Sequence, residues 1–435
     1  MDKFNVRKEI TALRVLFIFL FSSFIVPSVF AQENKGEIYQ YARKIVDTMA
    51  SESMHGRGYV NDGDKIAANY IRTEFQKNRL QSFTENYFQP FSLSINTFPG
   101  KISVKTDGIE LTPGKDFIVS SRSPSYSGKH AVVMADEKLV SKKKRFKKFL
   151  KQDFLNKIIV VNDTGKQTTG LLELADNSCK AAAIISLKEK LTWSASQKTA
   201  AFPLIEIVRS SYNNPKEVEI TIENKFIPDY QSQNIIAYIK GTEFPDSFIV
   251  FSAHYDHLGQ MGKQAYFPGA NDNASGCAML LNLANHYSLP ENKPGYSMVF
   301  IAFGAEEAGL LGSAYFTENP LFPLKNIRFL LNMDIMGTGE EGITVVNGSV
   351  FKEEFDTLVK INAQNNFIKE VKIRGKAANS DHYFFSEKGV KAFFIYTMGG
   401  TKAYHDIYDR PETLPLNEFE DLFKMILKFN DYLQN

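Results

Sequence analysis

The feature that most constrains the fold of this chain is the regular alternation of strand-like and helix-like segments after Gln231. The apolar, β-prone segments are NIIAYIKG, SFIVFSAH, SMVFIAFG, IRFLLNMDIMG, ITVVNG and VKAFFIYTMG. Residues with helical spacing of apolar positions follow or separate them, at 275–288, 307–317, 352–366, 380–388 and 416–434. Strands that are apolar throughout are buried on both faces, and parallel strands need crossover connections. The pattern predicts an α/β fold with a mixed, mostly parallel central sheet flanked by helices.

Two further segments complete the predicted organisation. Residues 32–95 show helical spacing at 36–50 and 64–79, and we expect them to form the N-terminal part of the domain that 230–435 completes. Residues 96–229 consist of short β-prone runs, such as ISVKT, HAVVMA, KIIVVND and FPLIEIV, with one helix-like segment, LLELADNSCKAAAIIS. They predict a small β-rich domain inserted into the larger one.

The segment 1–31 has the layout of a signal peptide. Basic residues precede an almost wholly apolar run from Val15 to Phe30, which is shorter than the roughly 20 residues that a spanning helix needs. An uncleaved membrane anchor is the alternative. Cleavage after Ala31 would deliver the protein to the periplasm or the cell exterior, without a stable membrane span. Cys179 and Cys277 could pair in an oxidising compartment, but they fall in different predicted domains, so we expect two free thiols.

The charge balance argues against a nucleic-acid-binding protein. Lys and Arg total 51 and Asp and Glu total 49, which gives a net charge of +2. One basic cluster extends from Lys142 to Lys151. The apolar residues within and after it, Phe146, Phe149, Leu150 and Phe154, are spaced to share one side of a helix. We therefore interpret the cluster as the solvated face of a helix rather than a patch for nucleic acid or an anionic surface.

Acidic and imidazole side chains gather where the predicted strands end. The candidates are His254 and Asp256 after SFIVFSA, Asp272 in the loop GANDNASG, Glu306 and Glu307 after SMVFIAFGA, Asp334 after IRFLLNM, and His405 after VKAFFIYTMGG. The carboxyl ends of strands form the ligand-binding edge of an open α/β sheet. Imidazole and carboxylate donors without a thiolate suit zinc or another divalent first-row metal. The sequence therefore predicts a metal centre at this edge.

Three of these residues suggest specific roles. Asp256 stands two residues after His254, so its carboxylate could orient the imidazole of that metal ligand. Two adjacent glutamates repel each other, and they make chemical sense if Glu307 binds a metal while Glu306 accepts a proton from water.

Ser380, Asp381 and His382 contain the three residue types of a serine-hydrolase triad. Neighbours in sequence do not face one another on a helix, so they cannot form the relay geometry. We expect Ser380 to cap the helix that follows. His382 remains an alternative to His405 as the last metal ligand.

The motifs HYDHLG, GANDNASG, FGAEEAGLLGS, NMDIMG and YHDIYD together resemble those of the peptidase family 28 metallopeptidases, which are co-catalytic zinc aminopeptidases. GRGYVNDGDKIAANYIRTEF resembles the N-terminal segment of that family, so the resemblance covers nearly all of residues 33–435. Within 96–229, KIIVVND, CKAAAIIS and FPLIEI more loosely resemble a protease-associated domain. The resemblance implies a zinc aminopeptidase-like fold with such an insert.

The same resemblance implies two zinc ions and a role for each candidate residue. Asp272 would bridge the ions, His254 and Asp334 would complete one site, Glu307 and His405 the other, Glu306 would be the general base, Asp256 would support His254, and Tyr404 would stabilise the tetrahedral intermediate. In that mechanism a hydroxide held between the metals attacks the scissile carbonyl of a peptide.

The resemblance leaves other activities open. Relatives with this fold include glutaminyl cyclases, which are acyltransferases with one zinc, glutamate carboxypeptidases, and the catalytically silent transferrin receptor. The complete set of metal-competent residues and Glu306 favours a two-metal hydrolase, and HYDHLG and NMDIMG are closer to the aminopeptidases. We therefore expect an exported enzyme that removes N-terminal residues from peptide substrates.

Overall fold

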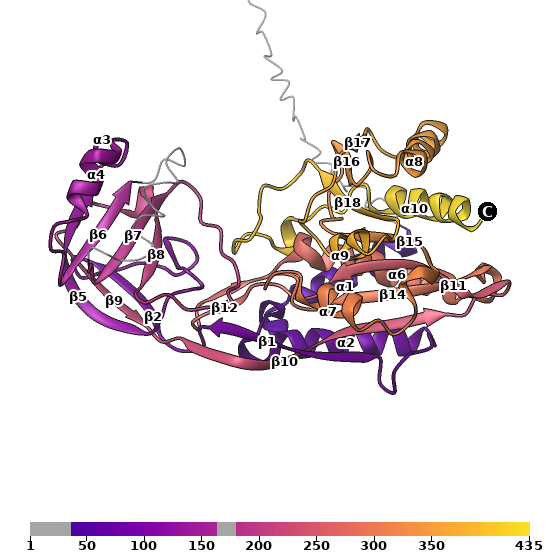
Figure 1. The fold of residues 1–435 in the computed structure, drawn as a ribbon, viewed down its shortest axis with the longest axis horizontal. Helices are drawn as coiled ribbons and strands as arrows, with labels where there is room; N and C mark the ends of the chain where they lie inside the picture. The colour runs from indigo at the N-terminus through magenta and orange to yellow at the C-terminus, as the bar shows by residue number, and fades with distance from the viewer. Residues whose placement is uncertain (1–35, 163–179) are drawn as a thin grey trace, which may run out of the picture. The chain divides into compact units, whose positions relative to one another are not determined.

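The computed structural model describes residues 36–162 and 180–435 (Figure 1). The predicted signal peptide and Cys179 lie outside these described residues. Two eight-stranded sheets organise the part of the chain that is described. Within the same two ranges, no helix combines the length and the apolar character needed to cross a bilayer.

The first sheet is mixed, as the sequence predicts. Its strands, in spatial order, are β1 (Phe88–Thr97), β10 (Lys225–Ile239), β14 (Tyr296–Phe303), β11 (Phe244–His254), β15 (Ile327–Met333), β18 (Ala392–Met398), β16 (Gly342–Val346) and β17 (Val371–Ile373). The central pairs β14–β11, β11–β15 and β15–β18 are parallel, and so is β16–β17. The pairs β1–β10, β10–β14 and β16–β18 are antiparallel.

Helices cover both faces of this sheet (Figure 1). The apolar core of one face contains α1 (Glu37–Met49), α2 (Gly63–Lys77), α6 (Gly276–Ser288), α8 (Lys352–Asn365) and α10 (Phe419–Gln434), and that of the other contains α7 (Leu311–Glu318) and α9 (His382–Glu387). Successive side chains of a strand point to opposite faces. On β11, Phe251 therefore packs in the core with α6, whereas Val250 packs in the core with α7 and α9. The flanked α/β sheet expected from the sequence is confirmed.

The second sheet lies within the segment 96–229. In spatial order its strands are β3 (Ile109–Glu110), β2 (Ile102–Thr106), β9 (Glu217–Ile222), β5 (Tyr126–Ala135), β6 (Lys157–Asn162), β7 (Ala183–Lys188), β8 (Leu204–Val208) and β4 (Phe117–Val119). The pairs β5–β6, β6–β7 and β7–β8 are parallel. Two short helices, α3 (Glu137–Val140) and α4 (Lys143–Phe149), connect β5 to β6. The boundaries of this insert and its kinship with protease-associated domains stay predictions.

The structure corrects two local predictions and confirms a third. Residues 183–186, predicted as part of a helix, lie in β7, where Ile184 and Ile185 pair with strands on both sides; residues 171–179 of that segment lie outside the described residues. Helix α7 begins at Leu311 rather than near residue 307, because positive φ at Ala305, Gly309 and Leu310 makes the preceding loop turn. The basic cluster does form a helix, and Phe146 is buried beneath it.

Strand β1 was not expected, and it extends the first sheet beyond β10. A small hairpin, β12 (Gly259–Met261) with β13 (Ala265–Phe267), follows β11. Its residues Met261, Ala265 and Phe267 share an apolar core with the second sheet. The connection after β11 therefore joins the two sheets through buried side chains.

The aromatic core under α10 gives a direct test of this packing. Phe329 on β15 is fully buried, with its ring centroid 5.0 Å from that of Phe393 and 5.5 Å from that of Phe429. We expect Phe329→Ala to lower the free energy of unfolding by about 3–5 kcal/mol, because it leaves a cavity. Phe226 on β10 is 41% exposed, so Phe226→Ala should cost under about 1 kcal/mol. Urea denaturation measures both, and similar losses would contradict the described core.

Candidate metal centre

The central strands of the first sheet lie side by side (Figure 1), and the predicted residues lie at their carboxyl ends. Strands β14, β11, β15 and β18 are neighbours and parallel, so their carboxyl ends meet. His254 ends β11, Glu306 and Glu307 follow β14, Asp334 follows β15, His405 lies in the loop after β18, and Asp272 lies in the π-helical turn Ala270–Ser275 before α6.

Two imidazoles and three carboxylates meet around Asp272. His254 Nε2 lies 3.3 Å from Asp272 Oδ1 and 3.3 Å from Asp334 Oδ1. His405 Nε2 lies 3.1 Å from Asp272 Oδ2 and 3.2 Å from Glu307 Oε2. Asp272 thus offers one carboxylate oxygen to each of the two imidazoles.

These side chains line a cleft of about 380 Å³. Its polar wall is formed by His254, Asp272, Glu306, Glu307, Asp334 and His405. Apolar, aromatic and amide side chains form the rest of the lining: Leu310, Ile335, Asn379, Phe394, Tyr396 and Tyr404. Tyr404 is 45% exposed, and its ring stacks on that of His405 at a centroid distance of 4.0 Å.

Protonation in the cleft reflects desolvation and mutual attraction. Desolvation raises the pKa of Glu306 well above its usual range and also raises the pKa of Asp334. Although burial opposes a charge on His405, the charge of Glu307 and hydrogen bonding to both carboxylates raise the pKa of that imidazole to about 11. Burial opposes ionisation of Glu307 as well, but the charge of His405 lowers its pKa to about 2. Positive charge is therefore favoured strongly between these carboxylates.

The chemistry of the donor set fits a divalent metal ion. Each of two groups, His254–Asp272–Asp334 and His257–Asp272–Glu307, brings three potential ligand atoms within 4.8 Å of one another. The two groups share Asp272. Crowded carboxylates repel one another, and a cation between them would offset that repulsion. Nitrogen and oxygen donors without sulfur are compatible with zinc.

His257 belongs to the site, although sequence reasoning missed it. Its Nδ1 lies 2.8 Å from Glu307 Oε1, and its buried Nε2 has no hydrogen-bond partner among the described residues. Its ring lies 5.9 Å from that of His405 at 75°, so the two histidines approach Glu307 through different oxygens. Its position directly after the strand that ends in His254 was the available signal.

The side chain of Asp256 supports the loop that carries Glu306 and Glu307 rather than the imidazole of His254. Its carboxylate accepts hydrogen bonds from the backbone N–H groups of Glu306 at 3.0 Å and Glu307 at 3.3 Å. The group nearest to His254 Nδ1 is the backbone carbonyl of Asp256 at 3.1 Å, while the carboxylate oxygen Oδ1 is 3.9 Å away. Asp256 therefore orients His254 mainly through its backbone and fixes the glutamate loop through its side chain.

The Ser380–His382 segment lies beside the site rather than in it. The ring of His382 packs against Phe394, and His405 rather than His382 is among the described residues that line the cleft. Ser380 does not cap α9, whose first flanking residue is Asp381. Instead its hydroxyl donates to Asp334 Oδ2 at 3.3 Å and accepts from the amide of Asn332 at 2.8 Å. Ser380 thus supports a candidate ligand, which the sequence did not indicate.

The loop that carries Asp272 is held from two sides. Arg57 is completely buried, and its guanidinium donates to five backbone carbonyls: Met49 at 2.9 Å, Tyr255 at 2.8 Å, Pro268 at 2.7 Å, Gly269 at 2.8 Å and Asp272 at 3.1 Å. The Asp409 carboxylate accepts from the N–H groups of Asn271 and Asp272, each at 2.9 Å. Carbonyls and amides of one short loop therefore have charged partners.

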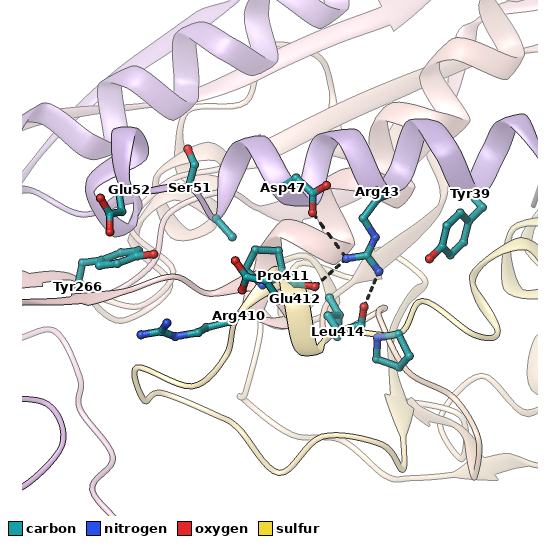
Figure 2. Close-up of a pocket in the computed structure, with 12 residues that line it drawn as sticks. Tyr39, Arg43, Asp47, Ser51, Glu52, Tyr266, Arg410, Pro411, Glu412 and Leu414 are labelled. Atoms are coloured by element: carbon teal, nitrogen blue, oxygen red, sulfur yellow. Dashed lines mark hydrogen bonds and ion pairs between the residues drawn. The ribbon is translucent and has the colours of Figure 1, made fainter. Parts of the chain in front are cut away.

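A larger hollow, of about 850 Å³, lies between α1 and residues 410–415 (Figure 2). Arg43 crosses it, donating to the carbonyls of Pro411 and Leu414 and pairing with Asp47 at 3.7 Å. None of the candidate metal ligands lines this hollow. The smaller cleft is the site because the titratable groups converge there.

Residues 234–430 match the sequence profile of peptidase family M28. Aminopeptidase YwaD of Bacillus subtilis is 30% identical over 249 residues, which are 54% of this chain and 51% of that protein. A probable zinc metalloprotease of Pyricularia oryzae is 39% identical over 113 residues, 25% of this chain and 22% of that protein. The chain thus aligns with about half of the length of the first relative and about a fifth of the length of the second.

Solved structures share the fold over a larger part of the chain. BSAP, a zinc aminopeptidase from Bacillus subtilis, has a TM-score of 0.68 at 21% identity, over 90% of this chain and 93% of that one. The peptidase M28 precursor from Shewanella amazonensis SB2B has a TM-score of 0.67 at 15% identity, over 92% and 96% of the two chains. These likenesses show the zinc aminopeptidase fold.

Arg57→Met tests whether the Asp272 loop depends on its buried guanidinium. It leaves five carbonyls without that donor, so we expect a loss of about 3–5 kcal/mol in the free energy of unfolding and a lower zinc content. The measurements are urea denaturation and zinc analysis after dialysis. Arg43→Met is the matched control, because Arg43 also donates to carbonyls but lies in the other hollow. Normal zinc content in Arg57→Met would contradict a role in shaping the site.

Proposed function

Because residues 234–430 match the sequence profile of peptidase family M28, we propose that this protein is a member of that family and a zinc-dependent aminopeptidase that removes N-terminal residues from peptides. The observation that carries the proposal is one cleft in which two donor groups share Asp272 and Glu306 stands beside them. We also propose that residues 1–31 direct export, so that the activity belongs to the periplasm or the cell exterior.

His254, Asp272 and Asp334 would hold one zinc ion, and Asp272 and Glu307 with His405 would hold a second, with His257 as a further donor or a support for Glu307. When bound, zinc supplies Lewis-acid stabilisation of the developing negative charge and lowers the pKa of bound water. Sharing of Asp272 between the two groups supports two ions rather than one.

Glu306 is the proposed general base. It lines the cleft, and desolvation raises the pKa of its carboxyl group, which suits a group that takes up and releases a proton. Its carboxylate accepts a proton from the attacking water and then delivers it to the leaving amine. Asp256 keeps Glu306 in place through the backbone N–H bond described above.

The remaining lining residues orient the substrate. Leu310, Ile335 and Phe394 give the cleft an apolar wall, which suits an apolar N-terminal side chain. Partial burial and the negative charges of nearby carboxylates, Asp272 first among them, raise the pKa of Tyr404, so its hydroxyl keeps its proton at neutral pH and can donate a hydrogen bond to the developing oxyanion. The carboxylates attract the free α-amine of the substrate, which favours removal of N-terminal residues.

The deciding experiment is mass spectrometry of a peptide pool incubated with the protein, with and without a zinc chelator. The pool contains free and N-acetylated peptides, some beginning with glutamine. We expect stepwise loss of N-terminal residues from free peptides only, fastest for apolar residues and abolished by the chelator. Loss of ammonia from glutamine peptides, shortening from the C-terminus, or no change in any peptide would each contradict the proposal.

Glu306→Gln tests the general base. The amide keeps the size of the side chain but cannot accept the proton, so kcat should fall by about 10²–10⁴-fold with zinc content and unfolding midpoint unchanged. Glu318→Gln, at the end of α7, is the control and should keep full activity. Near-normal turnover of Glu306→Gln would rule out this role.

Asp272→Asn tests the shared ligand. The amide presents one oxygen acceptor instead of two, so the variant should lose at least one of two zinc ions and most of its activity. Zinc per chain, measured by atomic absorption after gel filtration, is the readout. Wild-type stoichiometry in the variant would argue against sharing of Asp272.

A further inference from the structure

The connection from β7 to β8 leaves the second sheet and reaches the candidate metal centre. We name its residues Lys190–Gln197 the clasp segment. It contacts two separate loops of the site: the one that carries His405 and the one that carries Glu306 and Glu307. No residue of the clasp segment is among those that line the cleft, so any effect on the site passes through these loops.

The closest connection is between Trp193 and His405. The carbonyl oxygen of Trp193 lies 3.0 Å from His405 Nδ1, and the backbone N–H of Trp193 donates to the carbonyl of His405 at 2.9 Å. A carbonyl only accepts, so Nδ1 must carry the hydrogen of this bond. The bond therefore fixes the ring with Nε2 directed at Asp272 and Glu307, the orientation a metal ligand needs.

Trp193 is itself anchored on the second sheet and on the β12–β13 hairpin. Its indole Nε1 donates to the carbonyl of Val119 in β4 at 2.7 Å, and its ring stacks on Phe267 of β13 at 4.6 Å and 18°. The side chain belongs to the apolar core that also contains Leu258 and Met261. These contacts hold the Trp193 carbonyl still, because the buried indole cannot shift without breaking them.

The two ends of the clasp segment reinforce the same loops. Lys190 Nζ donates to the carbonyl of Lys402 at 2.8 Å and pairs with the buried Asp406 carboxylate at 3.0 Å. Gln197 Nε2 donates to the carbonyl of Ala308 at 2.9 Å, directly after the glutamate pair. Three anchoring points thus join one strand connection to the two loops that carry His405 and the glutamate pair.

We propose that the clasp segment is a positioning element for the proposed second zinc site, and that the second sheet is required to hold His405 in its metal-binding orientation. This inference rests on the proposed zinc function. It assigns to the segment 96–229 a direct structural part in assembling the centre, through a backbone carbonyl that acts on the ring of a ligand.

The test measures zinc affinity rather than turnover. Zinc dissociation constants are determined by competition with a chromophoric chelator for the wild type, Trp193→Ala, Lys190→Ala and Thr192→Ala. We expect Trp193→Ala to weaken one of the two ions by about 10–100-fold and to leave the other within about twofold. Lys190→Ala should weaken the same ion several-fold. Thr192 is exposed on the same segment, so Thr192→Ala should match the wild type.

A second readout separates positioning from general destabilisation. Trp193→Phe keeps an aromatic ring against Phe267 and lacks the Nε1 donor, and it secures the test if Trp193→Ala does not fold. Unfolding of each chelator-treated variant gives its stability without metal. Equal weakening of both ions, or wild-type constants in Trp193→Phe and Lys190→Ala, would overturn the inference. A wild type that binds no zinc would instead refute the proposed function.

Discussion

The crowding of carboxylates in one cleft is the constraint on which the rest of this structure depends. Asp272, Glu306, Glu307 and Asp334 line the same cleft, and their mutual repulsion would push their loops apart without opposing contacts. Each loop accordingly has a partner outside the cleft. Arg57 and Asp409 hold the first, Asp256 the glutamate pair, and Ser380 the last. The fold supplies fixed positions that the side chains alone would not keep.

Much of the fold and of the central site was predictable from the sequence, because both rest on local patterns. Uniformly apolar strands predict burial on both faces of the sheet. The polar residues at the ends of those strands, such as His254 and Asp334, predict the edge where a ligand binds. The short strand β7 was missed because alanines around it favour a helix, whereas pairing with β6 and β8 makes Ile184 and Ile185 extended. Helix propensity gives way to tertiary contacts in such cases.

The supporting contacts could not be predicted, and the reason is physical. Arg57 and Asp409 bind backbone atoms of residues far away in sequence, and Trp193 binds the distant His405 through its own backbone carbonyl. Every residue has a backbone carbonyl, so residue type does not indicate which of them takes part in such a contact. Nothing near Trp193 distinguishes its carbonyl from any other. Side chains that bind a metal ion or a substrate can be recognised in a sequence by residue type. The groups that orient those side chains can be identified only in the folded structure.

The order in which the chain is made has a consequence for when the site can exist. Its parts come from positions as distant as Arg57, Trp193 and His405. Synthesis proceeds from the N-terminus, so a growing chain has no complete site until residue 405 has been added and the long-range contacts have closed. A chain that ends before residue 405 therefore lacks part of the candidate metal centre, and the proposed activity requires synthesis of nearly the whole sequence.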